Sequence, residues 1–324
     1  MKRFIIEGPD QLVEARQCLA RISLPEGDFS RVVLLGMGGS ALSAGFVEML
    51  RKSHYQPWEW HVVREYDIPC PLDSETLVFT LSYSGNTEEA LATFAKAAES
   101  EATILAVSSG GKLAEEARTR GVAHIQIPPK PEGFQPRFAL YFMLGVVYET
   151  LVRLNLLDSI ESLDSLGAHL KSLNLAEQGR ELASWLGHRF PVVYTPPAYE
   201  TSVARIWRIK FNENTKMPAL WGALPEANHN EMIAFVPKFA KQFAVLLLTS
   251  DCVHPRITRR FELMEQMLTD VGYSVRTVPM EGANMLRKAL SSLMLADWVT
   301  YYMATAMQTD PVSIPAIQEF KKRL

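Results

Sequence analysis

Two stretches in the first half of the sequence join a buried strand to a helix through glycine and hydroxyl residues. One is "RVVLLGMGGS" (31–40) and the other is "LVFTLSYSGNTEEAL" (77–91). Each begins with an apolar run of strand length and ends where a helical pattern starts. Short apolar runs that alternate with helices indicate parallel strands with helices on both faces. These stretches therefore predict an α/β fold with a doubly wound parallel sheet.

The same order of elements occurs in both halves of the chain, which predicts two such sheet domains in tandem. A weakly apolar helical region after residue 152 separates them, so we expect an N-terminal domain at 1–152 and a C-terminal domain at 153–324. The repeat rests on the order of elements, because the residues of the two halves do not match directly. Strands are expected at 31–36, 60–66, 76–82, 102–109, 122–128, 191–196, 243–250 and 273–280, and the main helices at 6–21, 41–52, 87–100, 113–121, 138–157, 199–215, 254–272 and 284–307.

The glycine and hydroxyl turns suit a phosphate group. Ligands of open α/β sheets bind at the carboxyl ends of the strands, where the N–H groups of the next helix point at an anion. Glycines let the main chain approach the ligand, and serine and threonine hydroxyls add neutral donors. Neither the dinucleotide fingerprint nor a phosphate-binding lysine loop is present, since Ala41 follows "GMGGS". Each turn alone also fits a tight loop with a serine cap, but two of them, with a third at 108–111, predict a phosphate cradle.

Charge and composition argue against several classes of protein. The net charge is −3 with no large basic block, so neither nucleic acid nor an acidic membrane surface is expected as a partner. The N-terminal apolar run is short and broken by Glu7 and Asp10, unlike a signal peptide, and no run reaches the length of a membrane span. Cys18, Cys70 and Cys252 form no framework, which fits a reducing cytoplasm.

Five motifs resemble a known family in the right order along nearly the whole chain. They are "GMGGS" (36–40), "SYSGNTEE" (82–89), "SSGGKL" (108–113), "PR" (136–137) and "NENTKMPALWGALPEANHNEM" (212–232). Together they are similar to the bifunctional phosphoglucose/phosphomannose isomerases, whose subunits contain two sugar isomerase (SIS) domains. The resemblance implies a homodimer that interconverts fructose 6-phosphate with glucose 6-phosphate and mannose 6-phosphate through a cis-enediol. It implies neither a cofactor nor a metal ion.

The resemblance also assigns roles to particular residues. It implies that the substrate phosphate is bound by Gly39, Ser40, Ser82, Ser84 and Thr87. It implies that Glu213 is the isomerisation base and that Arg137 lies over the reacting carbons. His229 would assist ring opening from the neighbouring subunit, and Lys321 would also act in ring opening. Thr215 stands where the family often has alanine, and Val312 or Ser313 where it often has threonine, without removing any of these groups.

The residues by themselves are compatible with this chemistry but leave other readings open. One carboxylate can move a proton between C1 and C2, and the nearby Lys210 and Lys216 would keep Glu213 ionised. Glu213 could equally be a solvated glutamate at the end of a helix. A fixed guanidinium suits a developing enediolate, but Arg137 also fits a salt bridge at a helix start. His229 is the one histidine in a dense polar run, and it also reads as a loop residue.

Three alternatives follow from the sequence. His229, Glu231, Asp251 and His254 could in principle converge on zinc, but their spacing matches no common ligand pattern. A non-catalytic sugar-phosphate regulator would keep the cradle and lose the base. An isomerase of another phosphosugar would keep both.

Overall fold

The computed structural model describes residues 1–324 and divides into two compact units. The N-terminal unit is Ile6–Ala168, and the C-terminal unit is Met1–Ile5 together with His169–Leu324. The predicted division at 152/153 differs from this one, which falls inside helix α7 (Leu163–Ser172). The reason is local: the Tyr148 hydroxyl accepts hydrogen bonds from the Ile160 and Glu161 N–H groups, which holds the segment after residue 152 on the N-terminal unit.

The N-terminal unit is built on a parallel five-stranded sheet in the order β2-β1-β3-β4-β5. This is a doubly wound order, and its direction reverses between β1 and β3. All six residues of β3 are buried, as expected of a central strand covered on both faces. The strands are β1 (Arg31–Gly36), β2 (Glu59–Val63), β3 (Thr76–Leu81), β4 (Thr103–Ser108) and β5 (Ala123–Gln126).

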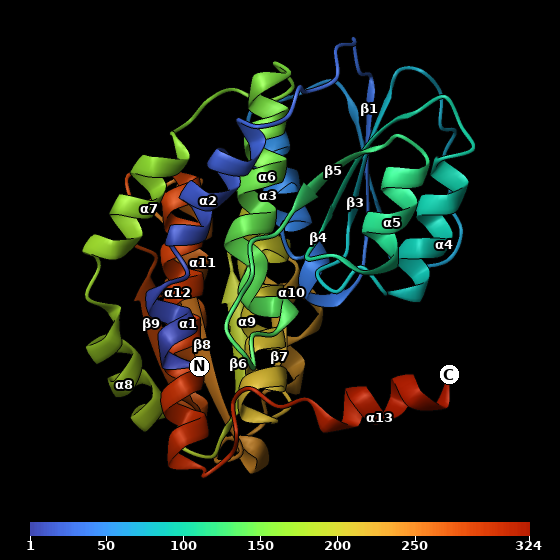
Figure 1. Ribbon diagram of the computed structural model, residues 1–324. Coiled ribbons are helices and arrows are strands. Elements are labelled where there is room, and N and C mark those ends of the chain that lie inside the picture. The colour runs from blue at the N-terminus through green and yellow to red at the C-terminus, as the bar shows by residue number, and fades with distance from the viewer. The chain divides into compact units, whose positions relative to one another are not determined.

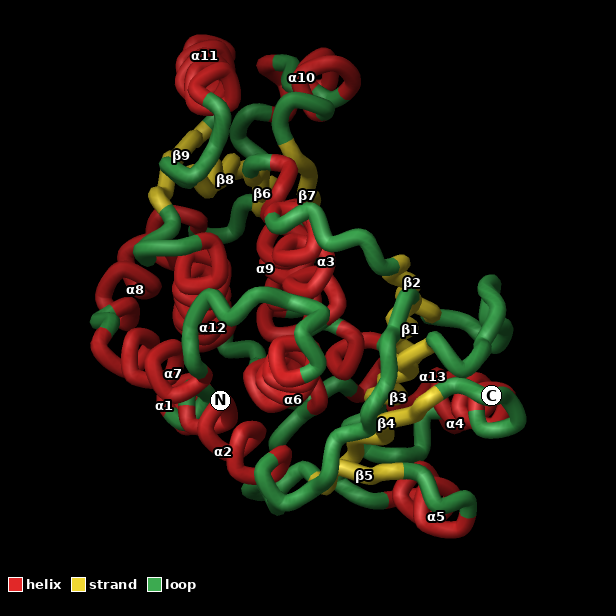
Figure 2. The backbone as a smooth tube through the Cα atoms, turned by 90° about the horizontal axis from the view of Figure 1, so that it is seen from above, coloured by secondary structure: helices red, strands yellow, loops and turns green.

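Helices cover both faces of this sheet. Phe94 of α4 and Leu113 of α5 pack on one face, against Val33, Val78 and Ala106. Helices α3 and α6 lie on the other face, with α2 beside α6 (Figures 1 and 2). The helices of this unit are α2 (Asp10–Leu19), α3 (Ala44–Ser53), α4 (Glu88–Ala97), α5 (Gly111–Thr119) and α6 (Leu140–Arg153), with 3₁₀ turns at Gly38–Ala41 and Pro136–Ala139.

The C-terminal unit repeats the topology with four parallel strands in the order β7-β6-β8-β9. When β6 is matched to β1, the order of the four strands is that of β2, β1, β3 and β4, and only β5 has no counterpart, which confirms the predicted tandem of doubly wound sheets. The strand β7 was not predicted, because Leu220–Ala223 is only four residues long and follows Pro218. The strands are β6 (Phe190–Thr195), β7 (Leu220–Ala223), β8 (Phe243–Thr249) and β9 (Ser274–Pro279).

Helices α10 and α11 lie on one face of the second sheet, and α8, α9 and α12 lie on the other (Figure 2). The predicted helix over 199–215 is interrupted, since its α-helical middle is flanked by π-helical turns at Glu200–Ala204 and Phe211–Thr215. No helix of the chain combines the length and apolar character of a membrane span. The remaining helices are α1 (Lys2–Ile6), α8 (Leu175–Leu186), α9 (Arg205–Lys210), α10 (Ala227–Asn230), α11 (Pro255–Val271), α12 (Met285–Ala306) and α13 (Pro315–Arg323), with 3₁₀ turns at Pro197–Tyr199, Met232–Ala234 and Pro237–Phe239.

Candidate functional site

The turns after β1 and β3 meet at the point where the order of the first sheet reverses. The Ser40 hydroxyl, which is buried, accepts a hydrogen bond of 3.0 Å from the Tyr83 N–H. This bond ties the two turns together across the sheet edge. The reversal point is where doubly wound sheets bind their ligands, so the sequence motif and the fold indicate the same place.

Gly39 allows a third segment to approach this edge. A Cβ atom at Gly39 would lie 2.6 Å from the Arg137 main-chain nitrogen and 2.8 Å from the Pro136 carbonyl carbon. No side chain fits there without moving the main chain. The structure therefore places Arg137 directly against the turn after β1. Its side chain is 2% exposed, with the guanidinium carbon 4.6 Å from the centre of the Phe138 ring, so it is not a surface arginine.

The turn after β3 leaves the start of α4 open to a ligand. Thr87 occupies the N-cap position of α4, but its side chain makes no capping hydrogen bond. Its hydroxyl instead accepts a hydrogen bond of 3.1 Å from the buried Ser82 hydroxyl. The first N–H groups of a helix have no acceptor within the helix. These groups and the exposed Ser84 are available to an anion at this turn.

The third turn, after β4, supports the second. The Ser109 hydroxyl donates to the Tyr83 carbonyl at 2.6 Å, and the Lys112 N–H donates to the Asn86 side chain at 3.1 Å. A Cβ atom at Gly85, where φ is +66°, would lie 1.8 Å from the Gly110 carbonyl oxygen. The two turns are therefore in direct main-chain contact. In this structure the turn after β4 holds the turn after β3 in place.

Two features of this edge are not among the residues predicted from the sequence. The Ser43 hydroxyl, one turn after Ser40, is fully buried and has no hydrogen-bond partner. The Tyr83 ring packs beside Phe134, with ring centroids 5.6 Å apart, and burial raises the pKa of its hydroxyl. The second serine of "GGSALS" was a signal for the first feature. Nothing in the sequence pattern predicted the second.

Glu213 lies in the π-helical turn that follows α9, in the C-terminal unit. The Lys216 ammonium donates to the main-chain oxygen of Glu213 at 2.6 Å and to that of Asp310 at 2.9 Å. The Lys210 ammonium is buried and donates to the Asp297 carboxylate at 2.6 Å. Of the two lysines near Glu213 in sequence, Lys210 is thus engaged with another carboxylate.

His229 and Glu213 lie at opposite edges of the second sheet. Glu213 precedes β7, whose first residue, Leu220, pairs with Val192 near the start of β6. His229 follows β7, whose last residue, Ala223, pairs with Thr195 at the end of β6. His229 is exposed in the short helix α10. The topology therefore separates these two groups within one chain.

Lys321 lies on α13, where every residue is exposed. The predicted residues thus fall into two sets. The N-terminal unit contains the cradle residues and Arg137, and the C-terminal unit contains Glu213, His229 and Lys321. The structure brings Gly39, Ser40, Ser82, Thr87 and Arg137 to the turns at one edge of the first sheet.

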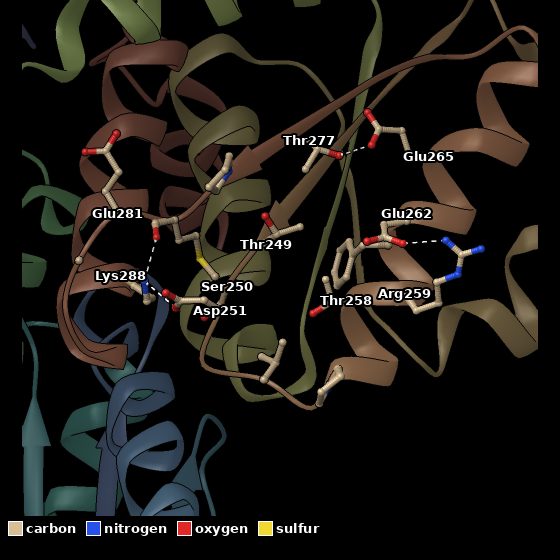
Figure 3. Close-up of a pocket in the computed structure, with 16 residues that line it drawn as sticks. Thr249, Ser250, Asp251, Thr258, Arg259, Glu262, Glu265, Thr277, Glu281 and Lys288 are labelled. Carbon is tan, nitrogen blue, oxygen red and sulfur yellow. Dashed lines mark hydrogen bonds and ion pairs between the residues drawn. The ribbon is translucent and has the colours of Figure 1, made fainter.

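The second sheet has a cavity of about 870 Å³ at the carboxyl ends of β8 and β9, shown in Figure 3. The buried Lys288 ammonium lies 2.9 Å from the exposed Asp251 carboxylate, and Thr277 donates to Glu265 at 2.9 Å. Four carboxylates and two cations line this cavity, so its charge disfavours a phosphate. They are Asp251, Glu262, Glu265, Glu281, Arg259 and Lys288.

Three of the four residues that could in principle bind zinc, Glu231, Asp251 and His254, have other partners. The Tyr194 hydroxyl donates to Glu231 at 2.5 Å, and burial together with Glu231 raises the pKa of Tyr194. Asp251 pairs with Lys288, and the His254 Nδ1 atom accepts a hydrogen bond from the Arg256 N–H. No group of three or more His, Cys, Asp or Glu side chains is arranged to hold a metal ion.

Comparisons with known proteins agree with this architecture. Residues 175–324 match the family model described as the bacterial phospho-glucose isomerase C-terminal SIS domain. A bifunctional phosphoglucose/phosphomannose isomerase of Aquifex aeolicus is 34% identical over 304 residues, which cover 91% of each chain. One from Thermoplasma acidophilum is 32% identical over 303 residues, which cover 93% of this chain and 92% of the relative.

Among solved structures, a hypothetical protein from Thermus thermophilus superposes with a TM-score of 0.76 at 16% identity. The superposition covers 98% of this chain and 88% of that one. At this level of identity the likeness shows the fold alone.

Proposed function

Because the chain belongs to the bifunctional phosphoglucose/phosphomannose isomerase family, we propose that it interconverts fructose 6-phosphate with both glucose 6-phosphate and mannose 6-phosphate. The chain is an isomerase by its membership of this family. The two sugar substrates, the cis-enediol intermediate and the independence from metal ions are parts of the proposal. Its main support is the uncharged cradle at the point where the first sheet reverses direction.

The cradle suits the dianionic end of a hexose 6-phosphate. Its donors are main-chain N–H groups at the start of α4 and hydroxyls from Ser40, Ser82, Ser84 and Thr87, while Gly39 keeps the turn after β1 open to the main chain. Neutral donors hold a phosphate that must later leave with the product. In this proposal the cradle fixes one end of the sugar, so that C1 and C2 have a defined position.

The reaction needs two kinds of proton transfer. Opening the ring removes the proton of the anomeric hydroxyl and delivers a proton to O5, which we assign to His229 and Lys321. Isomerisation moves one proton between C1 and C2, which we assign to the Glu213 carboxylate, and a second proton between O1 and O2, so that the carbonyl passes from one carbon to the other. Arg137 stabilises the negative oxygen of the enediolate. No electron enters or leaves overall, so the balance requires neither an oxidant nor a reductant.

We propose that the active form is a homodimer. The support is topological, because Glu213 and His229 lie at opposite edges of one sheet and a second copy can supply the missing group. We also propose a cytoplasmic location, which the three free cysteines support.

A coupled assay with glucose 6-phosphate and with mannose 6-phosphate, run in the presence of a chelator, tests the proposal. We expect turnover of both sugars by the unaltered protein. We expect Glu213→Gln to lower kcat for both by about a thousandfold or more, while fructose 6-phosphate binds within about threefold of its normal affinity. Glu262→Gln, which alters an exposed glutamate paired with Arg259, serves as the matched control.

The two alternatives give different results in the same assay. A regulator would bind fructose 6-phosphate without converting it. An isomerase of another phosphosugar would turn over a different member of a substrate panel and neither hexose 6-phosphate. Near-normal isomerisation by the Glu213 variant would show that this residue is not the base.

A further inference from the structure

The turn that contains Glu213 ends on a lysine in an uncommon main-chain conformation. Lys216 follows the π-helical turn Phe211–Thr215 and has a left-handed main chain, with φ of +60° and ψ of 22°. Glycine or asparagine usually occupies such a position at the end of a helix, because other side chains are strained there. A residue keeps this conformation only where its surroundings hold it. The Lys216 side chain is therefore expected to make contacts that glycine could not.

The ammonium group of Lys216 makes two hydrogen bonds to the main chain. It donates to the Glu213 carbonyl at 2.6 Å and, 94 residues further along the chain, to the Asp310 carbonyl at 2.9 Å. The last carbonyl groups of a helical turn have no N–H partner within the helix, and a cation near them is favourable. Lys216 thus closes the end of this turn and ties it to the segment that follows α12. All of these residues belong to the C-terminal unit.

The segment at Asp310 forms a turn of its own. The Asp310 carboxylate accepts hydrogen bonds from the Val312 N–H at 2.9 Å and from the Ser313 N–H at 3.3 Å, and these bonds lower its pKa. An aspartate that binds the N–H groups of the next residues in this way stabilises a local turn. Pro311, inside the turn, has a fixed φ angle. Lys216 therefore joins two turns that are each held by their own hydrogen bonds.

We propose that Lys216 is a positioning residue for the proposed base, Glu213. Lys210, just before this turn, and Asn214, within it, are bonded to α12, and Lys216 bonds the end of the turn to the segment after α12. Glu213 lies on the main chain between these three anchors. A displacement of about 1 Å at a reacting group can lower a rate by about a hundredfold. This inference rests on the proposed function, and it assigns Lys216 no contact with the sugar.

Hydrogen exchange tests the link between the two turns without any assay of turnover. Lys216→Met keeps an apolar stem and removes the ammonium, so the main-chain N–H groups of 211–217 and of 310–314 are expected to exchange at least about tenfold faster than in the unaltered protein. Lys241→Met, at an exposed site of the same unit, is the matched control and is expected to change neither segment by more than about twofold. Unchanged exchange of either segment in Lys216→Met would overturn the inference.

Steady-state kinetics separate positioning from substrate binding. Lys216→Met is expected to lower kcat for both hexose 6-phosphates at least about tenfold, while the Kd of fructose 6-phosphate stays within about threefold, because the phosphate cradle is untouched. Lys241→Met is expected to keep both values within about twofold. A normal kcat in Lys216→Met would contradict the positioning role. So would a normal kcat with a Kd weakened about tenfold, since Lys216 would then contact the substrate.

Chemical rescue tests whether the ammonium itself is responsible. In a chain with Cys18→Ser, Cys70→Ser and Cys252→Ser, which removes the native thiols, Lys216→Cys is alkylated with 2-bromoethylamine. This restores an ammonium on a side chain of the same length. Iodoethane adds the same two carbons without the charge. The amine is expected to raise kcat at least about fivefold above the ethylated protein, because only the amine can donate to the two carbonyls. Equal kcat after the two treatments would overturn the role of the ammonium.

The same variants separate this inference from the proposed function. If Glu213→Gln is inactive and Lys216→Met has a normal kcat, the proposed function stands and the positioning role fails. If Lys216→Met speeds hydrogen exchange in both segments and Glu213→Gln turns over normally, the link between the turns stands and the assignment of the base fails.

Discussion

Gly39 is a cradle residue whose size the fold restricts tightly. The main-chain atoms of Pro136 and Arg137 occupy the place where its side chain would lie. Gly38, its neighbour, has a positive φ of +50° but nothing within 4 Å of a built Cβ atom. Adjacent glycines thus have different reasons to be glycine. At Gly39 a side chain would clash with the main chain of residues 136 and 137, whereas Gly38 adopts a left-handed main-chain conformation.

We expect Gly39→Ala to separate the turn after β1 from Arg137. The overpacking should lower the free energy of unfolding by about 1–3 kcal/mol and lower kcat/KM at least tenfold. Gly38→Asn is the matched control, because asparagine tolerates the left-handed conformation and has open space there. Urea unfolding and steady-state kinetics measure both effects. An equal loss in the two variants would contradict the steric argument.

His124, which contacts the turn after β4, makes the stability of the protein depend on pH. Burial lowers the pKa of His124, whose Nε2 atom lies 2.8 Å from the Ser108 hydroxyl. An unfolded histidine has a pKa of about 6.5, so below that pH the unfolded chain binds more protons here than the folded chain. This contribution to stability is therefore present above about pH 6.5 and is lost as the pH falls toward the folded pKa.

We accordingly expect the free energy of unfolding to fall between about pH 7.5 and pH 5. His124→Gln should make this dependence shallower, because glutamine does not titrate. His188→Gln, at an exposed site, should leave it unchanged. Urea unfolding at several pH values measures the slope. The same slope in His124→Gln as in the unaltered protein would refute the assignment.

At the scale of elements, a buried ion pair joins α9 to α12. The Lys210 and Asp297 side chains are 4% and 7% exposed, and their charged atoms are 2.6 Å apart. Asn214, in the turn that contains Glu213, donates to Thr300 on the same helix at 2.9 Å. These contacts place the π-helical turn against α12, and so they position the proposed base.

Removing one member of the buried pair should lower the free energy of unfolding more than breaking an exposed pair does. We expect Lys210→Met to lower the free energy of unfolding by about 3–5 kcal/mol, because it leaves the buried Asp297 carboxylate without its cationic partner. Adding Asp297→Leu should recover most of the loss. Arg259→Met, which breaks an exposed pair with Glu262, should change stability by less than about 1 kcal/mol. Chemical denaturation of the unaltered protein and the three variants measures these differences, and equal losses in Lys210→Met and Arg259→Met would contradict the argument.

At the scale of the whole molecule, two sheets share one strand order but differ in the chemistry of their carboxyl ends. The first ends in glycines and hydroxyls, and the second in a cavity with an excess of carboxylates. The duplicated fold thus supplies one edge that suits phosphate and one that does not.

The division between the units predicts how the chain can be shortened. A fragment of residues 6–168 keeps the bonds of Tyr148 to Ile160 and Glu161, and that of the Trp58 indole to the Leu156 carbonyl at 2.7 Å. We expect it to unfold cooperatively in urea. A fragment of residues 6–152 should be less stable by several kcal/mol, because it exposes the groups that this segment covers. Equal urea midpoints for the two fragments would favour the domain boundary at 152/153 that the sequence predicts.

The sequence by itself determined the class of fold, eight of the nine strands, the tandem of sheets and the family. These features depend on local patterns: apolar runs, helix-forming stretches and glycine turns are visible along the chain. The tertiary structure decided the rest. The partner of Ser40, the burial of Arg137, the pairing of Lys210 with Asp297 and the two opposite edges of Glu213 and His229 all join residues distant in sequence. Such contacts depend on how the elements pack, and no spacing along a single chain encodes them.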